Sequence, residues 1–346
     1  MAEKAFHSSK WIWHNEEITE NQYAEFFDTI LFDGKKTVLR ISVRGDYTVF
    51  VNGEFAESNQ FADFEHYKVY DEIDITEKLE KGENHICFLV WYFGKSGMRH
   101  NTPQPGLIYE IESDGKIIAK SSEETKSRKS RAYLSGSDKI ISNQLGYSFT
   151  YNANLEDKWL TENGCGFEKS LVIGGTDDLS IRPTEKLKLA NPLSGKCTKV
   201  GKVYLFDFGR EIVGLPQINF CTEKAQKINV AYGEVLSGGH VKRLIHNRDF
   251  SFDYIAAPGE NTYTNYMFRF ACRYIEIQAE DEININSVSL VPQYYPVTEN
   301  KVTFENGGWI IARFSGTEPL IRIFCEMESR ERADEMISVM REFLKI

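Results

Sequence analysis

The chain has 346 residues, 41% of them hydrophobic, which is enough for packed cores in two or three domains. Its formal net charge of -10 argues against a nucleic-acid partner, because the phosphates of DNA or RNA need a basic face. No window approaches the roughly 20 apolar residues of a membrane span, and the first residues lack the apolar stretch of a signal peptide. We therefore expect a cytoplasmic protein without a membrane partner.

The composition favours a β-rich body without a bound metal or cofactor. The chain contains 17 Tyr and 23 Phe, and aromatic side chains favour half-buried strands. Its 6 cysteines are scattered without a C-x-x-C pair, which predicts reduced thiols and neither a zinc site nor a Cys–His nucleophile. Cys87, Cys221, Cys272 and Cys325 lie in apolar, strand-like runs and are predicted to be core residues.

Residues 1–190 are predicted to form a β-sandwich of jelly-roll type. Asn52-Gly53 provides the pair of positive φ angles that a tight hairpin requires. The sequence Arg44-Gly45-Asp46 is expected to be a turn between strands, and the basic run at residues 126–131 a solvated hairpin or linker. Short strands separated by turn signals are predicted at residues 37–43, 47–51, 85–92, 107–111 and 116–119. The last two are expected to form a hairpin with its turn at Asp114-Gly115.

Residues 91–101 combine aromatic and basic side chains in a glycine-punctuated loop. Jelly-roll modules hold glycans with an aromatic platform and planar polar groups at loop ends. The residues predicted to contact a sugar are therefore Trp91, Tyr92, Arg99 and His100. The alternative interpretation makes Trp91 a core residue and leaves Arg99 and His100 on the loop surface.

A second β-sandwich is predicted over residues 196–297. Residues 204–214 begin it, and a turn is expected at residues 258–261 because of the sequence Pro-Gly-Glu-Asn. No sequence repeat relates the two sandwiches. Further strands are predicted at residues 217–221, 227–232, 252–255 and 268–277.

Residues 298–346 form the third predicted domain, which is built around a phosphate-binding loop. Short apolar strands at residues 308–312 and 320–325 flank the loop. Its glycine lets backbone N–H groups approach an anion, its hydroxyls donate hydrogen bonds, and its guanidinium groups suit a phosphate. The alternative interpretation is a tight hairpin with two solvated arginines. The predicted phosphate-binding residues are Arg313, Ser315, Gly316, Thr317 and Arg322.

A helix is predicted after this loop, with Ser329 as its N-cap. Apolar residues recur at helical spacing at Ala333, Met336, Ile337, Met340 and Leu344. Residues 302–346, with the loop that runs from Arg313 to Pro319, resemble the C-terminal domain of the α-D-phosphohexomutases, the phosphoglucomutases and phosphomannomutases. The resemblance implies that the apolar stripe packs on a small sheet and that the loop binds phosphate.

Other parts of the phosphohexomutase pattern are absent from the sequence. Neither a T-A-S-H-N-P-like phosphoserine loop nor a D-x-D-x-D magnesium loop occurs. Residues 233–240 contain one residue too many for the sugar-specificity loop of G-E-x-S-G-H type. The chain is therefore not expected to form or transfer a phosphoryl group.

Residues 10–297 resemble the N-terminal β-sandwich domains of bacterial α-L-rhamnosidases. In that family the sandwiches precede a helical (α/α) toroid that carries the general acid and the base. The phosphohexomutase-like segment begins just after Pro296 instead, so the chain is predicted to be a chimera that lacks the toroid. The segments that carry the resemblance include Trp11-Ile12-Trp13, Tyr47 through Gly53, Gly146-Tyr147-Ser148, Phe206-Asp207-Phe208-Gly209 and Arg273-Tyr274-Ile275-Glu276-Ile277.

No catalytic residue is predicted. Inverting glycoside hydrolysis needs two carboxyls about 6.5–9.5 Å apart, and the sequence nominates no such pair among its 51 acidic residues. The main hypothesis is a non-catalytic carbohydrate-binding or scaffold part of a rhamnosidase-like glycoside hydrolase, joined to a phosphate-binding segment. Two alternatives stay open: a glycosidase active only with a toroid on a separate chain, and a phosphosugar-binding or mutase-related role of the C-terminal loop.

Overall fold

The structure is a computed structural model that describes residues 6–64, 66–96, 104–136, 139–142, 144–162, 166–175, 178–296, 301–305, 307–314 and 321–344. Within these residues the fold is mainly β, as predicted, with an α-helix near the C-terminus. The chain divides into two compact units. Unit 1 comprises Met1–Thr184 and Leu189–Tyr294, and unit 2 comprises Glu185–Lys188 and Tyr295–Ile346.

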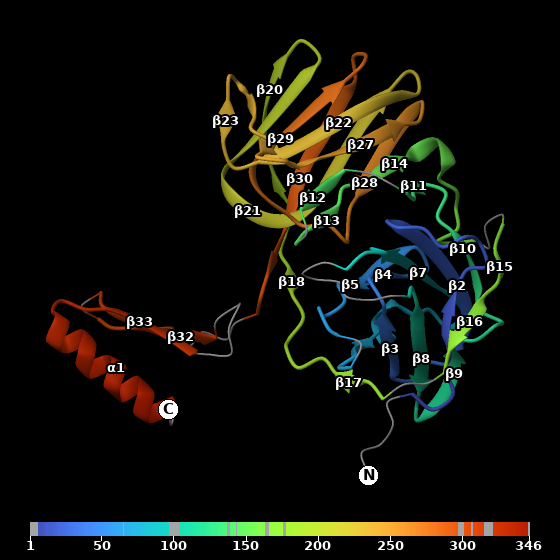
Figure 1. The fold of residues 1–346 in the computed structure, drawn as a ribbon, viewed down its shortest axis with the longest axis horizontal. Helices are drawn as coiled ribbons and strands as arrows, with labels where there is room; N and C mark the ends of the chain where they lie inside the picture. The colour runs from blue at the N-terminus through green and yellow to red at the C-terminus, as the bar shows by residue number, and fades with distance from the viewer. Residues whose placement is uncertain are drawn as a thin grey trace. The chain divides into compact units, whose positions relative to one another are not determined.

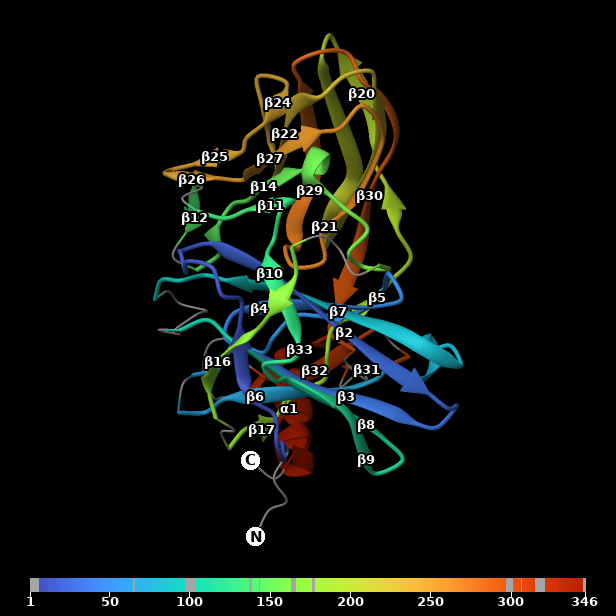
Figure 2. The ribbon, with the colours of Figure 1, turned by 90° about the vertical axis from the view of Figure 1, so that its right-hand side faces the viewer.

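The first sandwich of unit 1 consists of two facing sheets (Figure 2). The strands of one sheet are, in spatial order, β16 (Leu171–Gly174), β1 (Trp11–Trp13), β8 (Leu107–Ser113), β3 (Thr37–Val43), β6 (Val69–Asp74) and β17 (Ser180–Ile181), with β9 (Lys116–Lys120) paired to β8. The strands of the second sheet are, in spatial order, β15 (Glu168–Lys169), β10 (Lys126–Lys129), β2 (Gln22–Phe32), β7 (Gly82–Tyr92), β4 (Asp46–Val51) and β5 (Glu54–Ser58).

Three strands of that second sheet, β2, β7 and β4, are buried on both faces. Along β2, Ala24 and Phe26 point into the sandwich core, while Tyr23 and Phe27 belong to a second core on the opposite face. Successive side chains of a strand point to opposite faces, so a strand covered on both sides is apolar at odd and even positions alike. The buried strand predicted at residues 85–92 is confirmed as part of β7.

The second sandwich of unit 1 is built by a larger sheet. The long strand β21 pairs with β20 and β29 along its first half and with β28 and β30 along its second half (Figure 1). From the sequence, residues 204–214 are expected to begin this sandwich and residues 217–221 to form a strand of their own, whereas both lie in β21. The spatial order is β11 (Tyr133–Leu134), β14 (Thr150–Asn152), β27 (Ser251–Ala256), β22 (Gln226–Gly233), β29 (Phe270–Ala279), β21 (Val203–Thr222), β30 (Asn284–Tyr294) and β18 (Lys188–Leu189); β19 (Leu193–Ser194) pairs with β30, and β20 (Lys196–Val200) and β28 (Gly259–Thr264) pair with β21.

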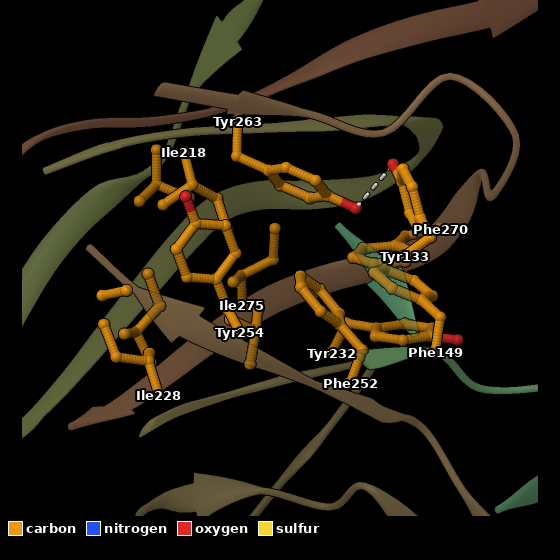
Figure 3. Packing of buried hydrophobic residues seen from close by; sticks show 14 of the residues in the cluster. Tyr133, Phe149, Ile218, Ile228, Tyr232, Phe252, Tyr254, Tyr263, Phe270 and Ile275 are labelled. Carbon is orange, nitrogen blue, oxygen red and sulfur yellow. Dashed lines mark hydrogen bonds between the residues drawn. The ribbon is translucent and has the colours of Figure 1, made fainter. Parts of the chain in front are cut away.

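Residues 133–152 lie in this second sandwich although they precede the predicted boundary at residue 190. Strand β14 pairs in parallel with β27. The chain then returns to the first sandwich, where β15 pairs with β10 and β16 with β1. One buried cluster accordingly joins Trp91 of the first sandwich to Phe149 and Phe252, which stack 4.4 Å apart (Figure 3). The two sandwiches therefore share a core and form one unit.

Short hairpins and turns complete unit 1. The glycine-rich residues 233–240 end in one of these hairpins, consistent with the strand and turn pattern expected there. The hairpins are β12 (Ile140–Ser142) with β13 (Gly146–Tyr147), β23 (Leu236–Ser237) with β24 (His240–Val241), and β25 (Leu244–Ile245) with β26 (Arg248–Asp249); the 3-10 turns are η1 (Thr76–Lys78) and η2 (Ala153–Leu155).

The prediction of a solvated hairpin or linker at residues 126–131 is wrong. These residues include strand β10, which lies between β2 and β15. Arg128 lies directly opposite Glu25 of β2 and is only 3% exposed. A long guanidinium can be buried in this way because carboxylates on neighbouring segments pair with it.

The cysteine prediction is confirmed in part. Cys87 and Cys272 are buried, whereas Cys221 and Cys325 are only partly buried. An apolar run therefore predicts the strand but not which of its faces is covered, because that depends on the neighbouring elements.

Unit 2 contains the sheet β31 (Lys301–Thr303), β32 (Trp309–Phe314) and β33 (Ile321–Glu326), with helix α1 (Arg330–Leu344) along one face (Figure 1). The predicted N-cap is confirmed, because the Arg332 N–H donates to the Ser329 hydroxyl at 3.2 Å. The predicted apolar stripe of α1 coincides with its partly buried positions. Among the residues described, no helix has the length and apolarity needed to cross a membrane.

Candidate functional site

A cavity of about 400 Å³ lies between the two sandwiches of unit 1. One wall is the outer face of the sheet that contains β2, β7 and β4, and the opposite wall comes from β28 and the residues that follow it. Its volume falls within the range of roughly 300–1,000 Å³ that is usual for ligand pockets. The lining residues that define its chemistry are Glu25, Thr48, Tyr133, Glu156, Tyr263 and Tyr266.

Tyrosine rings form much of the cavity wall. The Tyr133 and Tyr263 hydroxyls lie 3.2 Å apart (Figure 3). The Tyr151 ring lies 4.8 Å from that of Tyr263 and 4.9 Å from that of Tyr133. Tyr133 and Tyr263 are buried, so the partly exposed Tyr151 and Tyr266 are the rings with more surface to offer a ligand for stacking and hydrogen bonding.

Glu25 is the most strongly buried carboxyl of the cavity. It accepts hydrogen bonds from Arg128 Nε and from the Ser130 hydroxyl, each at 2.6 Å. Arg128 also holds Asp157 through two hydrogen bonds of 2.8 Å. Burial raises the pKa of Glu25 to about 7, although Arg128 and Ser130 act in the opposite direction. The Glu25 carboxyl is therefore close to its titration point near neutral pH.

Glu156 is the second carboxyl of the cavity and follows η2 in the chain. The Tyr151 hydroxyl donates a hydrogen bond to it. Desolvation raises the pKa of Glu156 above its ordinary value, and the hydrogen bond from Tyr151 opposes that rise. Both carboxyls therefore offer hydrogen-bond acceptors beside aromatic rings, an arrangement suited to binding hydroxyl groups.

The sequence interpretation missed this cavity. Glu25, Thr48, Glu156 and Tyr263 belong to four segments that are far apart in the chain. The one local signal was the alternation along β2, which places an acidic residue between the aromatic Tyr23 and Phe27 on a buried face. Among the residues described, no three metal-ligating side chains gather into a site for an ion.

Trp91 and Tyr92, two of the predicted sugar-contacting residues, lie in the protein core. Trp91 is 2% exposed and packs 4.8 Å from Phe268, while its Nε1 donates to Asn21 at 2.8 Å. Tyr92 is 4% exposed and belongs to the core on the other face of the sheet. Neither ring offers an open face for stacking, as the alternative interpretation expected for Trp91. Arg99 and His100 lie outside the described residues.

The predicted phosphate-binding residues are described only in part. Arg313 of β32 lies opposite Arg322 of β33, so the two strands bring both predicted arginines to the same end of the hairpin. Ser315, Gly316 and Thr317 lie outside the described residues, and Arg322 is exposed. Phosphate binding by this loop stays a prediction.

Two family models match the chain, in the order expected from the sequence. Residues 198–292 match the bacterial α-L-rhamnosidase concanavalin-like domain. Residues 279–342 match the C-terminal domain of phosphoglucomutase and phosphomannomutase. The two matches overlap at residues 279–292, which include most of β30; this strand pairs with β21 and therefore belongs to the sandwich. The resemblances to both families are thus confirmed.

The fold is similar to part of solved α-L-rhamnosidases. The α-L-rhamnosidase of Alteromonas sp. (strain LOR) is 24% identical over 268 residues, which are 70% of this chain and 28% of that protein. The GH78 rhamnosidase of Bacillus sp. GL1 superposes with a TM-score of 0.74 at 14% identity, over 85% of this chain and 56% of that one. The α-L-rhamnosidase of Streptomyces avermitilis, solved with L-rhamnose, superposes with a TM-score of 0.65 at 16% identity. The match covers 82% of this chain and 29% of that one.

These coverages show that the chain spans between 28% and 56% of the length of these three relatives. At such identities the structural likeness establishes the fold. The protein therefore resembles rhamnosidases in its sandwiches and phosphohexomutases in its C-terminal segment.

Proposed function

We propose that unit 1 is a non-catalytic carbohydrate-binding and scaffold part of an α-L-rhamnosidase-like glycoside hydrolase. The observation that carries the proposal is the cavity between the sandwiches, which lies in a fold shared with rhamnosidases and is lined by tyrosine rings and carboxyls. Sugars are bound in proteins by such a combination of apolar ring faces and a few polar groups.

The chemistry of the carboxyls supports binding rather than hydrolysis. A general acid must give its proton to the leaving oxygen while a second carboxylate activates water on the other side of the sugar. Glu25 is instead engaged by Arg128 and Ser130 on the protein side. Among the residues described, α1 is the one α-helix, whereas the rhamnosidase resemblance assigns the acid and the base to a helical toroid.

Binding and hydrolysis can be tested separately on the whole chain. We expect a glycan array to retain the protein on rhamnose-containing glycans, and we expect no release of nitrophenol from an aryl α-L-rhamnoside. Turnover that disappears on substitution of a single carboxylate would contradict the non-catalytic assignment. Absence of binding to every glycan on the array would contradict the carbohydrate-binding role.

A second candidate function, phosphosugar binding, is favoured by the phosphohexomutase match at residues 279–342. The expected observation is a rise in the unfolding temperature of unit 2 with glucose 6-phosphate, because a ligand at 100 times its Kd stabilises a fold by about 2.7 kcal/mol. Arg322→Ala should remove that rise, while Arg330→Ala, at an exposed position of α1, should keep it. A rise that persists in Arg322→Ala would contradict the phosphate-binding assignment of Arg322.

A further inference from the structure

Thr48 lines the cavity and carries a buried hydroxyl. It lies in β4 between Tyr47 and Val49, which both point into the core of the first sandwich, so its own side chain points to the opposite face. Thr48 is 1% exposed, and its Oγ1 has no hydrogen-bond partner among the described residues. Because burying an unpaired hydroxyl is unfavourable, a hydrogen bond between this atom and a bound molecule would be stabilising.

Thr48 and Glu25 are two ends of one row across the sheet. Glu25 lies opposite Leu89 in the pairing of β2 with β7, and Thr48 lies opposite Leu89 in the pairing of β4 with β7. Neighbouring strands are about 4.8 Å apart, so the two polar residues are separated by roughly 10 Å, with the apolar Leu89 between them. A sugar ring laid over Leu89 would have polar groups on either side.

The charges and apolar side chains of the residues that line the cavity indicate which class of sugar fits it. Of the residues described around the cavity, two are acidic and none is Lys, Arg or His, which disfavours phosphosugars and uronic acids. Glu25 is already paired with Arg128, so the cavity has less need of a cationic ligand. Phe50, Leu160 and Met267 add an apolar border. A neutral sugar with an apolar edge fits these features best.

On the basis of the carbohydrate-binding function proposed above, we propose that the cavity between the sandwiches binds one neutral sugar ring over Leu89. Its hydroxyls pair with Thr48 and with the carboxyls of Glu25 and Glu156, and an apolar edge, such as the methyl group of a 6-deoxyhexose, contacts the apolar border. The cavity of about 400 Å³ accommodates a sugar of this size rather than a long oligosaccharide.

The test is a calorimetric titration of the whole chain with methyl α-L-rhamnoside. Thr48→Val and Glu156→Gln should weaken binding at least fivefold, while Thr198→Val, on the exposed strand β20, should leave it unchanged. Thr48→Val should melt no lower than the unaltered protein, because it removes an unpaired hydroxyl without changing the volume of the side chain. Methyl α-L-mannoside, which differs from the rhamnoside only by a hydroxyl at C6, should bind more weakly.

The possible outcomes distinguish an error in the proposed binding site from an error in the proposed carbohydrate-binding function. Rhamnoside binding that is unaffected by Thr48→Val and Glu156→Gln overturns the cavity as the site and leaves the carbohydrate-binding function intact. Tighter binding of glucosamine or glucose 6-phosphate that is lost in Thr48→Val overturns the neutral class of ligand. Failure to bind any of these sugars, together with a blank glycan array, overturns both proposals.

Discussion

Two buried carboxyls of unit 1 show how surroundings set the charge of the same residue type. Glu110 accepts hydrogen bonds from the N–H groups of His7 at 2.8 Å and Ser8 at 2.9 Å, and from the Ser9 hydroxyl at 2.8 Å. Burial alone would raise the pKa of Glu110, but these donors lower it below its ordinary value. At Glu25 burial outweighs its donors, so the pKa rises to about 7. The balance between desolvation and hydrogen-bond donors decides whether the pKa rises or falls.

Glu25→Gln is predicted to change how stability depends on pH. The pKa of Glu25 is about 7 in the folded state against 4.5 ordinarily, so between these values the folded state binds a proton that the unfolded state has released. Stability from this group is therefore fully present below pH 4.5 and lost as pH rises to about 7. Between pH 5 and pH 8 the free energy of unfolding should fall less for Glu25→Gln than for the unaltered protein. The difference between the two decreases should be up to roughly 3 kcal/mol.

Urea unfolding at both pH values measures this difference. Gln keeps a side chain of the same size that can still contact Ser130, and Arg128 keeps Asp157 as a partner, so the variant is expected to fold. Glu83→Gln, at a carboxyl that is 67% exposed, controls for the removal of one negative charge. Equal pH slopes for Glu25→Gln and the unaltered protein would show that Glu25 is ionised in the folded state throughout this range.

At the scale of elements, the turn between β3 and β4 has almost no room. Gly45 lies in this turn with φ 155°, and a Cβ atom there would lie 2.0 Å from the Trp91 carbonyl oxygen. The turn between β8 and β9 differs, because a Cβ on Gly115 would meet nothing within 4 Å, although φ is 73°. The two turns were predicted alike from the sequence, and only their surroundings distinguish them.

Gly45→Ala is therefore predicted to destabilise unit 1 more than Gly115→Ala. The first change forces β4 and β7 apart at their ends and should cost about 3 kcal/mol, the upper end for overpacking. The second only places an L-residue in the left-handed region, at about 1 kcal/mol. Thermal unfolding of both variants gives the comparison, and equal losses would contradict the close approach at Gly45.

At the scale of the whole molecule, the two units differ in how much they bury. Unit 1 shares one aromatic cluster between its sandwiches. In the described part of unit 2, Ile310 and Ala312 are buried, but no residue of α1 is. A segment of this size usually needs further support for a stable core. Its stability is therefore expected to be the lower of the two.

Hydrogen exchange should reveal this difference directly. Amides of β32, β33 and α1 are predicted to exchange faster than those of β2 and β7, because local opening costs least where few apolar contacts are lost. Limited proteolysis should correspondingly cut residues 298–346 before residues 10–296. Uniform protection along the chain would contradict the prediction.

Much of the fold was predictable because it depends on local patterns. The hairpin at Asn52-Gly53 and the turn at Asp114-Gly115 require positive φ angles, which the structure contains at all four residues. The apolar spacing of α1 and its cap at Ser329 were also predictable, because both depend on residues that are only a few positions apart in the sequence. The buried state of Arg128 did not, since a run of basic residues indicates solvent exposure unless acidic partners lie nearby in space.

The sequence by itself determined the β-rich class, the order of the two sandwiches and the C-terminal α+β segment, because strand alternation, turn residues and helical spacing are properties of neighbouring residues. Only the tertiary structure decided that the outer face of β2, β4 and β7 would be covered by the second sandwich. That packing buried Trp91 and enclosed Thr48 beside Tyr263, while the pairing of β10 with β2 placed Arg128 against Glu25. The candidate site is formed by distant segments, and their proximity follows from the packing of whole sheets.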